Sequence, residues 1–268
     1  MKELRVRQQQ KQRRQRLFVG GFAAALVIIV AVVLVSTLTS GTTNKKTASP
    51  PSSSTTSASA PTTTTTAAST TPVSVKLVPA PTKVGCPKLN GTSPHYTHFS
   101  AGPPMCIDAA KTYTADMLTD LGPVTIKLLA SQDPVTVNNF VFLSLYHFYD
   151  GTVFHRVVTG FVDQGGDPTG TGSGGPGYSF NGGAPKSARV YTAGALAMAN
   201  SGSPASDGSQ FFIVVGKGGA ALPPNYSYFG QVTGGMPVVN KINADGSPSE
   251  TGTPKVLHRV VKVTISEI

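Results

Sequence analysis

The sequence predicts a mainly β domain with two helices, an antiparallel sandwich or barrel, over residues 108–268. From Lys111 onward, short runs rich in Val, Ile, Phe or Tyr are bounded by clusters of Gly, Pro or Asn, which is the pattern of strands separated by turns. Two stretches with apolar residues at helical spacing interrupt these runs. The size of the region is typical of one domain.

The two helices are predicted from their start and stop signals. The first begins at Pro134, because Asp133 is a good N-cap and proline is favoured at the first helical position. Its apolar face is expected to consist of Val137, Phe140, Val141, Leu145 and Phe148. The second helix, residues 236–242, ends at the run Asn243-Ala244-Asp245-Gly246.

Six apolar runs are the expected strands: residues 124–129, 151–158, 195–200, 209–215, 226–232 and 260–268. The glycines of residues 170–175 match the dinucleotide-binding pattern GxGxxG, but Pro176-Gly177 follows where a helix should begin, so we expect a surface loop. The chain has no Gly-x-Ser-x-Gly motif of serine hydrolases. Alternation along a strand sends His155 and Arg156 to opposite faces, which favours a structural role for His155 over a role as general base.

Basic residues crowd the N-terminal tail, residues 1–16. Seven Lys or Arg and one Glu give it a charge of +6, which leaves +4 of the total +10 for the rest of the chain. The folded part is therefore only mildly basic, and we expect no nucleic-acid partner.

An uncharged apolar stretch follows from Leu17 to Leu38, and it predicts a transmembrane helix over residues 17–39. The preceding basic residues predict a cytoplasmic N-terminus, with the rest of the chain outside the cell membrane. A cleaved signal peptide is the main alternative, but this stretch exceeds the usual apolar length of about 7–15 residues and no Ala-x-Ala cleavage site follows. A buried core helix is disfavoured because every face is apolar.

Residues 40–74 are rich in Ser, Thr, Pro and Ala, and they have too little apolar surface to offset the entropy of ordering, so we expect a linker. The lead-in, residues 75–107, contains the two cysteines of the chain, Cys86 and Cys106. On the outer side of a membrane they favour one disulfide over two free buried thiols. A zinc site with His95 and His98 is a further alternative, but its spacing fits no common zinc module, and we expect no metal.

Residues 154–167 read FHRVVTGFVDQGGD and place Arg156 within apolar runs. Such an arginine costs free energy unless its guanidinium is paired or used. A buried ion pair with Asp163 or Asp167 is one explanation. A second comes from four stretches in order: residues 154–167, the glycine-rich loop after them, 195–215 and 222–232. Together they resemble the cyclophilin-type peptidyl-prolyl cis–trans isomerases over roughly Tyr113–Ile268, and the anchored, Thr-rich architecture resembles the membrane-anchored members of actinobacteria.

The resemblance implies a closed eight-stranded antiparallel barrel with two helices, and a reaction that needs no cofactor. It implies that Arg156 and Gln164 are the catalytic residues, with Gln164 orienting Arg156 and contacting the substrate backbone. A guanidinium aimed at the proline nitrogen would stabilise the twisted amide, whose nitrogen carries a lone pair that the planar amide lacks. The implied substrate-binding residues are Phe161, Val162, Ala199, Asn200, Gln210, Phe212, Leu222 and Tyr226.

Three positions depart from the family pattern. Val162 stands where a methionine is usual, and Tyr226 stands where the animal enzymes carry a pocket histidine. Ala221 replaces a tryptophan that binds cyclosporin, which argues against tight cyclosporin binding. We expect retained activity with an altered substrate preference.

The sequence thus predicts a membrane-anchored isomerase that acts on proline-containing segments of secreted or envelope proteins. The alternatives are a tethered proline-peptide-binding or chaperone-like module with little turnover, and a structural envelope protein that makes its contacts through the lead-in.

Overall fold

The computed structural model describes residues 77–268. The basic tail, the transmembrane helix and the linker predicted for residues 1–74 lie outside the described residues. Within 77–268, no helix has the length and apolarity needed to cross a bilayer.

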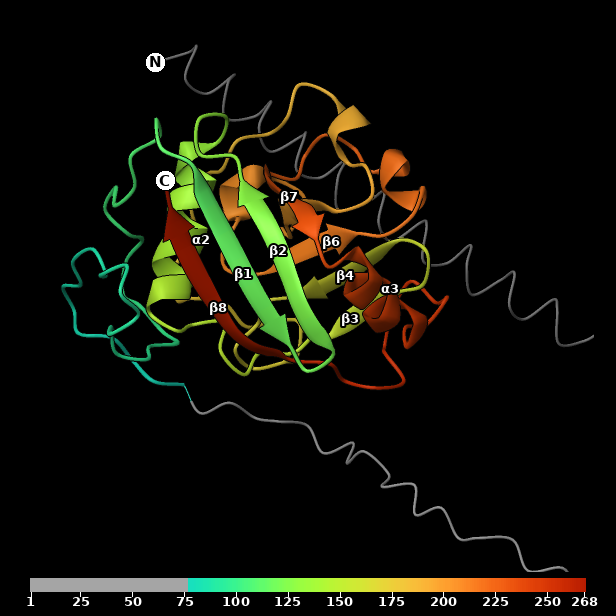
Figure 1. Cartoon of the computed structure of the whole chain (residues 1–268), viewed down its shortest axis with the longest axis horizontal. Helices are drawn as coiled ribbons and strands as arrows, with labels where there is room; N and C mark the ends of the chain where they lie inside the picture. Colours follow the sequence, from blue (N-terminus) through green and yellow to red (C-terminus); the bar gives the residue numbers. More distant parts are fainter. Residues whose placement is uncertain (1–76) are drawn as a thin grey trace, which may run out of the picture. The chain divides into compact units, whose positions relative to one another are not determined.

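Eight strands form one antiparallel sheet in the order β3-β4-β6-β5-β7-β2-β1-β8 (Figure 1). In chain order they are β1 (Tyr113–Thr119), β2 (Gly122–Leu128), β3 (Arg156–Val158), β4 (Val162–Gly165), β5 (Ala195–Met198), β6 (Phe211–Val214), β7 (Tyr228–Gly234) and β8 (Val260–Glu267). The sheet curls, but its end strands β3 and β8 do not pair with each other in the part of the chain that is described. The structure is therefore a curled half-barrel, and the closed barrel implied by the resemblance was wrong in this respect. β3 has only three residues, and a single bridge between Val153 and Arg259 lies before the two end strands.

Two strands were missing from the expected set. β1 alternates strictly, with Tyr113, Ala115, Met117 and Thr119 buried, but its Ala, Asp and Met are weak strand formers. Pairing with both β2 and β8 stabilises it. β4 is polar in half of its residues and lies between β3 and β6. Conversely, residues 151–155 belong to no strand apart from bridges at Val153.

Both helices are confirmed. α2 (Pro134–Leu145) begins as predicted, and the Asp133 side chain accepts a hydrogen bond from the backbone N–H of Thr136 at 3.1 Å. α3 (Met236–Ala244) ends within the Asn-Ala-Asp-Gly run, two residues beyond the predicted end. α2 is buried on all sides from Thr136 to Leu145, not on one face alone, because both the lead-in and the segment that contains Tyr178 pack on it.

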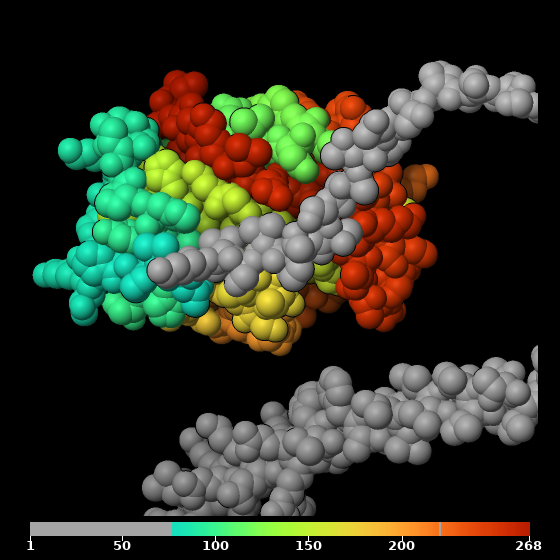
Figure 2. All heavy atoms as spheres, turned by 90° about the horizontal axis from the view of Figure 1, so that it is seen from below, coloured from blue at the N-terminus to red at the C-terminus, as the bar shows by residue number. Residues whose placement is uncertain are grey.

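The lead-in packs on α2 through aromatic rings. The Phe99 ring lies 5.2 Å from that of Phe142, and the Tyr96 ring lies 5.6 Å from that of Tyr146. Figure 2 shows these lead-in residues, in blue-green, forming one end of the folded domain. Cys86 and Cys106 form a disulfide, as predicted. The alternatives of free thiols and of a zinc site are wrong, because both sulfur atoms are consumed by this bond.

Candidate active site

The register of three strands aligns the central residues of the site. Arg156 on β3 lies opposite Gln164 on β4, and Gln164 lies opposite Phe212 on β6. Residues paired across antiparallel strands share one face of the sheet. The sheet therefore places a guanidinium, an amide and an aromatic ring in one row, although 56 positions separate the first from the last.

Arg156 is held by neutral acceptors. Its Nε and Nη2 donate to the backbone carbonyl of Glu250 at 3.2 and 3.0 Å, and its Nη1 donates to Oε1 of Gln164 at 3.3 Å. The guanidinium makes no ion pair with a carboxylate within residues 77–268. The alternative of an ion pair with Asp163 or Asp167 is therefore wrong.

The two aspartates have other partners. Asp163 faces away from the row, is fully buried and accepts a hydrogen bond from the side chain of Asn243 on α3 at 2.6 Å. Burial raises the pKa of its carboxyl from 3.8 to about 7, and the Asn243 hydrogen bond opposes this only in part. Asp167 accepts hydrogen bonds from the backbone of the glycine-rich loop.

A small apolar cluster lies beside the row. Phe212 and Val162 are two of its six buried members, with 4% and 2% of their surface exposed, and Phe161, Ala199, Leu222 and Tyr226 are among the side chains that pack against it. The Tyr226 ring meets the Phe212 ring edge to face, with centroids 5.4 Å apart. The cluster thus offers an apolar surface beside the polar groups of the row.

Tyr226 is held in place by a tyrosine that the sequence did not single out. The hydroxyl of Tyr191, which is almost fully buried, donates to the backbone carbonyl of Tyr226 at 2.7 Å and accepts from its N–H at 3.1 Å. Burial raises the pKa of Tyr191 to about 12, so the hydroxyl keeps its proton under physiological conditions.

Asn200 lies at the rim between this cluster and a second, polar region. Its Nδ2 donates to the Asp207 carboxylate at 3.0 Å and to the backbone carbonyl of Asn225 at 2.9 Å. Asp207 is fully buried and also accepts from the Ser227 hydroxyl. Burial raises its pKa to about 6. With its side chain so engaged, Asn200 has only its backbone free to contact a peptide.

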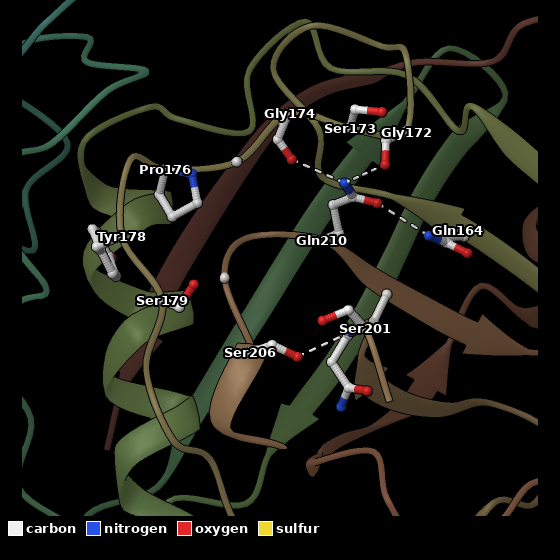
Figure 3. Close-up of a pocket in the computed structure, with 14 residues that line it drawn as sticks. Gln164, Gly172, Ser173, Gly174, Pro176, Tyr178, Ser179, Ser201, Ser206 and Gln210 are labelled. Carbon is white, nitrogen blue, oxygen red and sulfur yellow. Dashed lines mark hydrogen bonds between the residues drawn. The ribbon is translucent and has the colours of Figure 1, made fainter. Parts of the chain in front are cut away.

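Gln210 links the row to the glycine-rich loop (Figure 3). Its Oε1 accepts from Gln164, and its Nε2 donates to the carbonyls of Gly172 and Gly174 at 3.0 and 2.9 Å. Asp167 fixes this loop by accepting from the N–H groups of Thr169, Thr171, Gly172 and Gly174. A Cβ at Gly174 would lie only 1.9 Å from the Asp167 carboxylate, so this position requires glycine.

The loop forms one wall of a pocket of about 410 Å³, which we call the polar pocket. Gln164, Gln210, Ala199 and Asn200 line it on the side of the row, and Pro176, Tyr178, Ser179, Ser201, Ser206 and Gly208 line the rest (Figure 3). It thus adjoins the apolar cluster across Ala199 and Asn200. The sequence predicted a surface loop here and did not predict a pocket wall.

All ten residues implied by the resemblance therefore converge in one place. The sequence did not identify the Glu250 carbonyl, Tyr191 or Asp207, and it named Asp167 only as a possible partner of Arg156. The dense glycines of residues 170–175 were the one local signal of the loop that Asp167 holds. His155 lies partly buried near Gly172, away from the apolar cluster, and burial lowers its pKa.

Comparison with known proteins supports the same conclusion. Residues 114–265 match the family model described as cyclophilin type peptidyl-prolyl cis-trans isomerase/CLD. The chain is 40% identical over 169 residues to peptidyl-prolyl cis-trans isomerase B of Streptomyces anulatus, which covers 57% of this chain and 94% of that protein. It is 39% identical over 145 residues to peptidyl-prolyl cis-trans isomerase CYP18-2 of Arabidopsis thaliana, covering 53% and 85% of the two chains.

A solved structure shows the same fold. The cyclophilin type peptidyl-prolyl cis-trans isomerase of Cryptosporidium parvum superposes with a TM-score of 0.51 at 32% identity, covering 58% of this chain and 98% of that one. A second crystal structure of that protein was determined in the presence of the dipeptide Ala-Pro. With the family match spanning the whole sheet and the site, the chain belongs to the cyclophilin-type peptidyl-prolyl cis–trans isomerases and is an enzyme of that class.

Proposed function

We propose that Arg156 is the catalytic residue, that Gln164 positions it, and that the apolar cluster holds the substrate proline. The observation that carries the proposal is the set of hydrogen bonds made by the guanidinium. Of its five N–H groups, three are directed at Glu250 and Gln164, which leaves two for a substrate. The guanidinium is thus fixed in direction and still able to donate.

The reaction requires no bond to be made or cleaved. The barrier of about 20 kcal/mol to Xaa-Pro rotation comes from amide resonance, which is lost when the bond twists. In the twisted state the proline nitrogen has a lone pair, and an N–H of Arg156 can donate to it. Because this hydrogen bond is absent from the planar cis and trans states, it stabilises the twisted transition state more than either of them. The barrier to rotation is therefore lower.

The apolar cluster and the polar pocket would divide the peptide between them. Phe161, Phe212 and Leu222 would contact the proline ring, while Ala199 and the backbone of Asn200 would contact the preceding residue. The polar pocket lies beyond these two residues and would receive a side chain further toward the N-terminus of the peptide. Its hydroxyl and amide groups favour a polar side chain there.

Exchange spectroscopy by NMR on a short Ala-Pro peptide tests this role, with the full-length chain in detergent micelles. Arg156→Ala is expected to lower kcat/KM by about 100-fold or more, as removal of one preorganised transition-state donor does. Arg156→Lys keeps the charge and loses the planar geometry, so it should remain far below the parent. Arg259→Ala removes an exposed arginine that has no hydrogen bond to Gln164 or Glu250 among the described residues, and it is the control. Full exchange in Arg156→Ala would refute the catalytic role, and peptide binding without exchange in the parent would favour the alternative of a binding module.

We further propose that this enzyme is anchored in the cell membrane by residues 17–39, as in the membrane-anchored actinobacterial members that it resembles. Its substrates would be proline-containing segments of secreted or envelope proteins as they fold outside the cytoplasm. The basic tail before the apolar stretch supports this orientation. The Cys86–Cys106 disulfide supports an oxidising compartment for the folded domain.

Protease treatment of intact cells tests the location. The folded domain should be released from whole cells by cleavage in residues 40–74, while a cytoplasmic marker protein stays intact. Protection of the domain until the cells are lysed would overturn the proposed orientation.

A further inference from the structure

The outer side of the polar-pocket wall is covered by the lead-in. The N–H of Phe99 donates to the carbonyl of Pro176 at 2.7 Å. A Cβ at Gly177 would lie 2.4 Å from the Phe99 carbonyl oxygen, and one at Gly102 would lie 3.5 Å from the Tyr178 ring, so the two segments are in close contact. Pro176 and Tyr178 therefore have the pocket on one side and the lead-in on the other.

Two adjacent asparagines of α2 connect the lead-in to the pocket. Asn138 accepts from the N–H of Cys106 at 2.7 Å and donates to the carbonyl of Pro104 at 3.0 Å. Asn139 accepts from the Tyr178 hydroxyl at 2.7 Å and donates to the carbonyl of Gly208 at 2.8 Å. Both Tyr178 and Gly208 line the polar pocket. One turn of α2 thus holds the disulfide segment and two pocket residues together.

The disulfide closes the part of the lead-in that carries Phe99. The residues between Cys86 and Cys106 are mostly exposed, and few of them are buried apolar side chains. Phe99 is the main exception, with 2% of its surface exposed, and its ring packs on Phe142 and Tyr146. A segment this polar gains little free energy from burial. The disulfide compensates in part, because it reduces the conformational entropy that the segment loses when it folds.

We propose that the lead-in is a specificity-determining element of the isomerase: with its disulfide closed, it holds Pro176–Tyr178 in place and so sets which side chains preceding proline the polar pocket accepts. This inference rests on the proposed placement of the peptide. It extends the substrate site to residues 77–107, which lie outside the stretch that matches the family model.

The contacts assign the lead-in to recognition and not to the chemical step. None of its hydrogen bonds within the described residues reaches Arg156, Gln164 or the apolar cluster. Those groups are held by the sheet and by the Glu250 carbonyl. Loss of the lead-in contacts should therefore weaken binding of peptides that reach the polar pocket and leave kcat on shorter peptides unchanged.

The test compares two peptides on the full-length chain. Ac-Ala-Pro-Phe-amide ends before the polar pocket, and Ac-Gln-Ala-Pro-Phe-amide places a polar side chain in it. For the double variant Cys86→Ser/Cys106→Ser we expect Kd of the longer peptide to rise about 5-fold, while Kd and kcat of the shorter one change less than about 2-fold. Phe99→Leu keeps an apolar side chain at the same place. It should also raise the ratio of the Kd of the longer peptide to that of the shorter one, but by less than the double variant does.

Leu89→Ala is the matched control, because Leu89 lies within the same disulfide loop, is 45% exposed and does not line the polar pocket. It should leave the ratio of the two Kd values unchanged. An unchanged ratio in both the disulfide-free variant and Phe99→Leu would overturn the proposal, as would an equal loss for both peptides. Because binding is titrated directly, the result does not depend on whether Arg156 is the catalytic residue.

Discussion

The apolar cluster and the polar pocket adjoin each other but are built in different ways. The first rests on β4, β5 and β6, whose paired backbones fix Val162 and Phe212 and the side chains packed on them. The second is lined by loops, and its outer wall depends on Asp167, on Asn139 of α2 and on the lead-in. The part of the site that would hold proline thus rests mainly on the sheet, whereas the part that would read the rest of the peptide rests on loops.

This difference explains how one reaction can be combined with different preferences for the peptide residues around proline. In the proposed mechanism, the chemical step needs only a fixed guanidinium and a place for the proline ring, and strand register aligns Arg156, Gln164 and Phe212 for this purpose. Recognition of further residues of the peptide depends on loops. The sequence of a loop can change with little effect on the stability of the sheet. We therefore expect substitutions in the apolar cluster to lower activity on all peptides. Substitutions around the polar pocket should instead change the selectivity between peptides.

The largest effect should follow from Phe212→Ala, which acts on the region built by the sheet. The ring is 4% exposed and packs on Tyr226, so its removal leaves a cavity and should lower the free energy of unfolding by about 3 kcal/mol. Short and long peptides should lose kcat/KM alike, because both place proline there. Urea unfolding and NMR exchange measure the two effects, and selective loss for long peptides alone would contradict the division.

A smaller effect is expected for Asp163→Asn, on the opposite face of the same sheet. The pKa of about 7 in the folded state lies above the unfolded value of 3.8, so protonation of this carboxyl stabilises the folded state. Its contribution to the free energy of unfolding is complete below about pH 4 and is lost as the pH rises through about 7. A tenfold difference in proton affinity corresponds to about 1.4 kcal/mol. We expect the variant to be more stable than the parent by about 2 kcal/mol at pH 8, with the gain disappearing near pH 4.

Urea unfolding at several pH values measures this dependence. The activity of Asp163→Asn at neutral pH should equal that of the parent, because Asp163 contacts Asn243 and not Arg156. A parallel pH dependence in the parent and the variant would show that another group is responsible.

The smallest effect on stability, about 1 kcal/mol, is expected for Asp167→Asn, which acts on the loop region alone. The N–H donors of the loop hold the pKa of Asp167 below its usual value despite its burial, so its contribution is present at neutral pH and is lost as the pH falls below about 4. An amide keeps one acceptor oxygen but turns an N–H₂ toward the remaining donors. KM for peptides that reach the polar pocket should rise about 3-fold, with that for shorter ones unchanged. Equal changes in both would mean that the loop supports the whole site.

The sequence by itself determined the elements that depend on local signals. Asp133 and Pro134 marked the start of α2, and the Asn-Ala-Asp-Gly run marked the end of α3, because capping and turn chemistry act over a few residues. The resemblance of four stretches identified the family and predicted ten site residues, which the fold brings together. Two cysteines in a polar segment were enough to predict their disulfide.

Only the tertiary structure decided what depends on partners distant in sequence. β1 forms because strands on both sides pair with it. In the described part of the chain, the two end strands β3 and β8 do not pair, and hydrogen bonds between residues 151–154 and 258–260 link the ends of the sheet. Glu250 acts through a backbone carbonyl, which no side-chain pattern reveals, and the lead-in contacts the polar-pocket wall only because α2 lies beneath both. These contacts join segments whose positions the fold sets, so local sequence cannot specify them.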